Sequence, residues 1–197
     1  MNLERFGVKF FARKDQNLDD RVFIDIFQQW IQQDKLSGIP IDVVDYRHVP
    51  EGPGVMLITH HINFAVDYTA GRFGLLAQQK LSLVDGPLGQ KILALLRATA
   101  EFAALLESDP RVAEKLVFEA GQFEFFANDR LHAPNTDAAY EALRPALLEA
   151  ARLAYPGADV QVSRQANDPR QRLTLAVESG QPLTPAGLLA RLSQPVR

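Results

Sequence analysis

Hydrophobic residues in the first sixty positions follow two spacings, and each spacing predicts a different type of element. The run FGVKFFA at 6–12 is rich in β-forming residues and predicts a strand. Over 18–34, apolar residues recur at the spacing that places them along one face of a helix. Strands are then expected at 41–46 and 55–60, on either side of a Pro- and Gly-rich loop. Residues 1–60 therefore have the order strand, helix, strand, strand.

The second half of the chain repeats this order. Strands are expected at 116–118 and 123–127, with 119–122 as the turn of a hairpin, followed by a helix over 136–154 and strands at 160–163 and 173–177. The triplet Phe-Phe-Ala occurs at 10–12 and again at 125–127, before a polar loop and an amphipathic helix each time. We predict an α+β protein with a duplicated β-α-β-β unit in a pseudo-two-fold arrangement, whose antiparallel sheet or sheets are covered by helices.

Between the two copies lies an insertion, and a short tail follows the second. The insertion contains an expected hairpin, with strands at 63–68 and 73–79, and a helix that starts near Pro87 and ends near Glu107. This helix is apolar over much of its surface, so we expect it to be deeply buried or at an interface. Thr184 and Pro185 predict a short C-terminal helix that docks on the body or a partner, with a disordered end as the alternative. The four parts, 1–60, 61–115, 116–179 and 180–197, are expected to form one compact domain, with a cleft at the seam between the copies.

Composition narrows the classes of function. The chain has 197 residues, 47% of them hydrophobic, and a net charge of -3 without long runs of like charge, which disfavours nucleic acid as a partner. The first residues do not resemble a signal peptide, and no segment approaches the roughly 20 apolar residues of a membrane span. We therefore expect a cytoplasmic protein that does not bind membranes. The absence of cysteine excludes disulfides and thiolate ligands, so any metal would need His and carboxylate ligands.

The densest set of chemical groups lies within 41–67. If 49–54 is the loop between two strands, Asp42 pairs across from His61 and Val43 across from His60, which places the two histidines on opposite faces. One metal would then need His48 or a further carboxylate such as Asp67. A histidine with a cross-strand carboxylate partner is the stronger interpretation of this cluster. The candidate ligand or metal residues are Asp42, Asp45, Tyr46, His48, His60, His61 and Asp67.

Two polar loops that precede helices are candidate anion sites. Arg13 and Lys14 lie before the first helix, and Arg130 and His132 lie before the helix at 136–154. The simpler alternatives are a solvated first loop and a second loop in which Asn135 or Thr136 caps the helix while Asp129 pairs with a neighbour. The EGPG loop at 51–54 is better interpreted as a tight turn than as a phosphate cradle. The sequence contains no GxSxG, HExxH or paired-carboxylate motif.

The stretches IDVVDYRHVPEGPGVMLITH at 41–60 and FFANDRLHAPNT at 125–136 resemble a family of bacterial proteins with no assigned activity. The resemblance extends through most of the chain and implies no mechanism. The duplicated order is also similar to the layout of gyrase-inhibitor-like and SOUL-type small-molecule-binding proteins, a likeness of topology alone.

These observations leave three hypotheses for the function. The leading one is a non-catalytic protein, expected as a homodimer, that binds a small molecule or a protein partner at the seam between the copies. A metal-dependent hydrolase would use the His and Asp cluster of 42–67. An adaptor would dock its apolar helix or its tail on another protein. The sequence specifies no ligand, substrate or cofactor.

Overall fold

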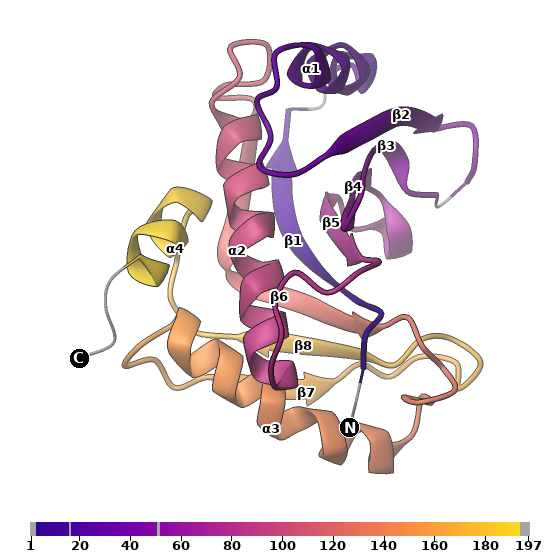
Figure 1. Ribbon diagram of the computed structural model, residues 1–197, viewed down its shortest axis with the longest axis vertical. Coiled ribbons are helices and arrows are strands. Elements are labelled where there is room, and N and C mark those ends of the chain that lie inside the picture. The colour runs from indigo at the N-terminus through magenta and orange to yellow at the C-terminus, as the bar shows by residue number, and fades with distance from the viewer. Residues whose placement is uncertain (1–2, 16, 51, 194–197) are drawn as a thin grey trace.

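The computed structural model describes residues 3–15, 17–50 and 52–193, and it contains both strands and helices (Figure 1). The strands are β1 Phe6–Lys14, β2 Pro40–Tyr46, β3 Gly54–Thr59, β4 Ile62–Asp67, β5 Gly74–Gln79, β6 Leu116–Ala127, β7 Gln161–Arg164 and β8 Thr174–Glu178. The helices are α1 Arg21–Gln32, α2 Leu88–Glu107, α3 Asp137–Ala154 and α4 Pro185–Leu192, with a short 3-10 turn η1 at Thr69–Gly71.

All eight strands form one antiparallel sheet in the order β2-β3-β4-β5-β1-β6-β8-β7. The expected α+β class and the antiparallel sheet covered by helices are confirmed. At the centre, β1 of the first predicted copy pairs with β6 of the second. On one side β3 and β2 follow after the inserted β4 and β5, and on the other side β8 and β7 follow. The two sides differ by β4 and β5, which lie between β1 and β3, and the duplication stays a prediction.

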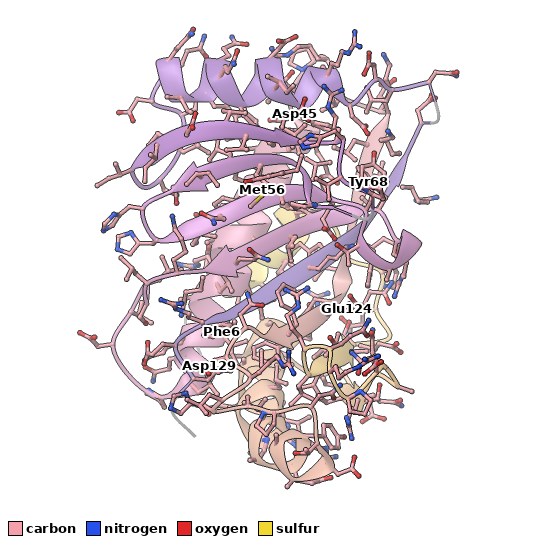
Figure 2. All side chains as sticks on the ribbon, turned by 90° about the vertical axis from the view of Figure 1, so that its right-hand side faces the viewer. Phe6, Asp45, Met56, Tyr68, Glu124 and Asp129 are labelled. Atoms are coloured by element: carbon pink, nitrogen blue, oxygen red, sulfur yellow. The ribbon has the colours of Figure 1, made fainter. Side chains whose placement is uncertain are left out.

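The helices of the described residues pack on one face of the sheet. Figure 1 shows α2 lying along the sheet, with α1 at one end and α3 at the other. Strand β1 shows how alternation divides the two faces, because Phe6, Val8 and Phe10 join the core beneath the helices. Lys9, between them, points to the opposite face, which Figure 2 presents to the viewer.

Helix α2 is buried along most of its length, as expected from its sequence. Ile92, Leu95 and Leu96 are fully buried, and Phe102 is 3% exposed. The helix packs on β1, β5 and β6 and also contacts α3 and α4. It is therefore the central element of the helical layer.

Side-chain caps fix the starts of two helices at the positions that the sequence indicated. Thr136 accepts a hydrogen bond from the Ala139 backbone N–H at 3.2 Å, and Thr184 accepts one from the Gly187 N–H at 3.1 Å. The helix that Thr184 opens, α4, docks on α2 and buries Leu188. The docked tail helix is thus confirmed, while Glu51 of the EGPG loop and residues 194–197 of the tail lie outside the described residues.

The hairpin expected over 116–127 is wrong, because this segment is one continuous strand, β6. The pairing of β1 and β6 shifts register between Lys9 and Phe11, so the middle of β6 leaves its partner. There the Ala120 N–H donates to the Leu183 carbonyl at 2.8 Å, and a Cβ on Gly121 would lie 1.9 Å from the Gln181 oxygen. Gly121 therefore marks a close approach between two backbone segments. In the sequence, a glycine at such a contact looks the same as a glycine in a turn.

Within the described residues, no helix is long and apolar enough to cross a membrane.

Candidate functional site

The two adjacent histidines do not lie opposite the residues that the sequence suggested. Asp42 pairs with Ile58, and Val43 with Leu57. His60 and His61 instead form the two-residue turn between β3 and β4, with ring centroids 4.7 Å apart. The turn is closed by Thr59, whose hydroxyl donates to the Ile62 carbonyl at 2.7 Å and accepts from the Ile62 N–H at 3.2 Å. The expected pairing was wrong because β2 ends at Tyr46, opposite Gly54, which shifts the register of β2 and β3 by three residues from the one expected.

The other candidates in 41–48 lie on the edge strand β2 and the turn after it. Arg47 donates to both oxygens of Asp45, at 2.9 and 2.7 Å, and this pairing lowers the pKa of Asp45 to about 2. Tyr46 and His48 are exposed, with ring centroids 6.3 Å apart. Asp42 is exposed and accepts from the backbone of the next residue. Across the part of the chain that the structure describes, no three His, Asp or Glu side chains are grouped closely enough to hold a metal.

Asp67 differs from the rest of this cluster because it is fully buried. Its carboxylate lies 2.5 Å from the ammonium of Lys9, and the two side chains are 1% and 4% exposed. Lys9 also donates to the carbonyl oxygen of Arg72 at 2.6 Å, and Asp67 accepts from the Thr69 hydroxyl at 2.7 Å. A buried ion pair is tolerated where further hydrogen bonds satisfy both charges, as they do here.

The candidate anion-binding residues Arg13 and Lys14 lie at the end of β1, and each faces a different carboxylate. Arg13 is 80% exposed and lies 4.0 Å from Glu119. Lys14 is held by Asp20 at 2.5 Å and by the Tyr68 hydroxyl at 2.9 Å. Burial and the hydrogen bond to Asp20 raise the pKa of Tyr68. Lys14 therefore belongs to a structural cluster that joins β1 to the start of α1.

In the second loop, Asp129 pairs with His132 and not with Arg130. The two groups are 2.6 Å apart, and the hydrogen bond lowers the pKa of Asp129. His132 is 61% exposed, which favours a local role in shaping the loop. Arg130 forms no ion pair with any described residue and lines a cleft on the face of the sheet without helices.

This cleft, which we call the seam cleft, has a volume of about 570 Å³ and crosses the junction of β1 and β6. The loop between β7 and β8 forms one of its walls. Glu124, labelled in Figure 2, marks its position on the open face of the sheet. Four cationic side chains line the cleft against two carboxylates, although the whole protein is acidic. The charged lining residues are Lys9, Asp67, Glu124, Arg130, Arg170 and Arg172.

Arg172 is the partly buried cation of the seam cleft that has no carboxylate partner among the described residues. It is half-buried, and its guanidinium lies 4.4 Å from the centre of the Phe126 ring. The guanidinium makes one hydrogen bond among the described residues, to the amide oxygen of Asn128 at 2.9 Å, and no described carboxylate is within ion-pairing distance. Burial lowers the pKa of Arg172, an effect that the charge of Asp67 partly opposes. An arginine nevertheless stays protonated, so this partly desolvated charge favours an anionic partner.

The position of Phe126 depends on a glycine in the neighbouring strand. Gly7 pairs with Phe126 across β1 and β6, and a Cβ on Gly7 would lie 2.3 Å from the Phe126 ring. The ring packs on Leu76 and is 4% exposed. Gly7 therefore leaves the space in which the ring lies flat and supports Arg172.

The β7–β8 loop is held in place by side-chain amides. Asn135, before α3, donates to Asn167 at 2.6 Å, and Asn167 donates to the Arg172 carbonyl at 2.9 Å. Gln165 donates to Glu124, which also accepts from Arg72 at 3.4 Å. The wall of the cleft that carries Arg172 is therefore fixed to both β6 and the start of α3.

Of the residues singled out in the sequence, Asp67 and Arg130 line the seam cleft, and the others do not. Sequence reasoning missed Arg172, Phe126 and Gly7. The prediction of a cleft between the two expected copies was the one feature of the sequence that indicated this location. Residues of β1 and β6 form the floor of the seam cleft. The chain matches no model of a protein family, and comparisons with curated proteins and with solved structures find no match either.

Proposed function

We propose that the protein is a non-catalytic binding protein that holds a small organic anion in the seam cleft. The observation that carries the proposal is Arg172, a half-buried guanidinium stacked on an aromatic ring without a carboxylate partner among the described residues. Arginine recognises planar carboxylates and phosphates through two parallel hydrogen bonds. With one donor bound to Asn128, the remaining donors of Arg172 are available to a ligand.

The lining of the cleft favours an organic anion over a simple ion. Phe126 and Leu76 supply an apolar floor next to the guanidinium, and Arg130 adds a second cation at the rim. The volume of about 570 Å³ lies within the ~300–1,000 Å³ typical of small-molecule sites. A carboxylate or phosphate ester with a flat or short aliphatic body would satisfy both parts of the site.

The bonding within the cleft supports binding more than catalysis. Both of its carboxylates are engaged, Asp67 by Lys9 and Glu124 by Gln165 and Arg72. A general acid or base needs a proton-transfer group within reach of a substrate. Here the carboxylates instead hold the cations that shape the cleft.

Calorimetric titration with benzoate, citrate and adenosine monophosphate tests this proposal. We expect at least one of these anions to bind, and Arg172→Gln to weaken that binding by about tenfold or more, because a charge-assisted pair is lost. Arg152→Gln is the matched control, since Arg152 is exposed on α3 away from the cleft. If none of the anions binds, or if both variants bind as the wild type does, the proposal is wrong.

A further inference from the structure

A second hollow lies on the other side of the sheet, between α2, the β3–β4 turn and the segment 35–38. We call it the helix-side pocket; its volume is about 540 Å³. It shares no lining residue with the seam cleft. Any ligand that it holds is therefore recognised independently of Arg172.

The inner walls of the helix-side pocket are apolar. The rings of Phe64 and Phe102 stack with centroids 4.2 Å apart and close one end. On α2, Ala94 and Ala98 face the hollow, and their small side chains leave space that longer ones would fill. Water in such a space has few polar partners, so an apolar group that displaces it is favoured.

Basic side chains surround the mouth of this pocket. Lys35 and Arg97 are exposed, and His61 is half-buried beside them. Arg97 donates one hydrogen bond to the Leu192 carbonyl at 2.6 Å, while the side chains of Lys35 and His61 make no hydrogen bond or ion pair within the described residues. The one carboxylate of the lining, Glu101, accepts a long hydrogen bond of 3.4 Å from Ser37.

We infer that the helix-side pocket binds an amphipathic carboxylate, with its acyl chain against Ala98 and Phe102 and its head group between Lys35 and Arg97. The apolar depth requires an aliphatic body, and the basic mouth selects an acidic end. A neutral lipid of the same length would fill the pocket but would make no charge-assisted contact with these cations. A polar anion would satisfy the cations and leave the apolar walls hydrated.

Calorimetric titration with decanoate below its micelle concentration, and with decanol as the uncharged analogue, tests this inference. We expect decanoate to bind more tightly than decanol by about tenfold, since each cation adds a charge-assisted contact. Lys35→Gln combined with Arg97→Gln should remove most of this preference. Both positions are exposed, so this variant should fold as the wild type does.

Ala98→Leu tests the location, because its side chain would occupy the hollow. We expect it to weaken decanoate binding by about tenfold or more. Ala142→Leu, the same change at an exposed position of α3, should have no effect. The single tryptophan gives a second readout, since Trp30 contacts Phe102 with ring centroids 5.2 Å apart and its emission should shift on binding.

The outcomes separate this inference from the proposed function. Unchanged decanoate binding by Arg172→Gln, together with its loss in Ala98→Leu, would support two independent sites. No binding of decanoate to the wild type would overturn the inference. Equal affinity for decanol and decanoate would show that the pocket does not select an acidic head group. Unchanged decanoate binding by Ala98→Leu would show that the ligand does not bind in the helix-side pocket.

Discussion

The seam cleft and the helix-side pocket lie on opposite faces of one sheet, and they place charge differently. In the seam cleft the charged groups form the floor and walls, where Lys9 and Asp67 are almost completely buried. In the helix-side pocket the floor is aromatic, and the charges lie at the mouth. Both arrangements follow from alternation along the strands, because Lys9 and Phe10 are neighbours in sequence that face opposite sides.

The difference shows what a covering layer of helices does. Beneath α2, apolar side chains are buried against other apolar side chains. A pocket between them therefore has apolar walls. On the open face, burial comes from side chains and the β7–β8 loop, which bring polar groups with them. Each buried charge there needs a partner, and Arg172 is the position where the described residues do not supply a carboxylate.

Removal of one partner of the buried pair should have the largest effect. Asp67→Ala would leave the Lys9 ammonium buried without its counter-charge, and we expect a loss of about 3–5 kcal/mol in the free energy of unfolding. Urea denaturation measures this loss. The double variant Lys9→Met with Asp67→Leu should recover most of it, since no unpaired charge remains. A loss below about 1 kcal/mol in Asp67→Ala would show that the site is more hydrated than the structure indicates.

A larger side chain at position 7 should disrupt binding in the seam cleft and leave binding in the helix-side pocket unchanged. Gly7→Val would force the Phe126 ring out of its place, and overpacking of this kind costs about 1–3 kcal/mol. We expect anion binding in the seam cleft to be lost, because the ring supports Arg172, while decanoate affinity stays unchanged. Calorimetry on the folded variant measures both. Loss of both activities would mean that the two faces are not independent.

The smallest expected effect is a pH dependence on the helix-covered side. The hydrogen bond from Arg111 lowers the pKa of Asp109, and the charge of Lys35 contributes. The folded pKa is then below the unfolded value of about 3.9, so this contribution to stability is present above that pH and is lost as the pH falls through the folded pKa. Asp109→Asn should lower stability by about 1.5 kcal/mol at pH 7.

The same variant should lose less stability than the wild type when the pH is lowered through that range. Thermal unfolding followed by circular dichroism between neutral and acidic pH measures the two slopes. Parallel curves for the wild type and Asp109→Asn would show that the pair does not contribute to the acid dependence.

Local features of the sequence were enough for the class and for most of the elements, the single strand β6 excepted. The helical spacing of 18–34, the caps at Thr136 and Thr184 and the apolar surface of α2 all matched the structure, because periodicity and capping act between residues a few positions apart. Boundaries shifted by a few residues, as with α1, which spans Arg21–Gln32 where 18–34 was expected.

The tertiary structure alone decided which groups are partners and which charge has none. Asp67 lies 58 residues from Lys9, and Arg172 lies 44 residues from Asn128, separations at which local patterns give no information. The strand β6 looked like a hairpin because Gly121 has the same sequence signature in a turn and in a close backbone contact. The sequence by itself therefore determined the element types through short-range physics. The seam cleft and the helix-side pocket arose only when distant strands met, since burial and pairing are properties of the folded arrangement.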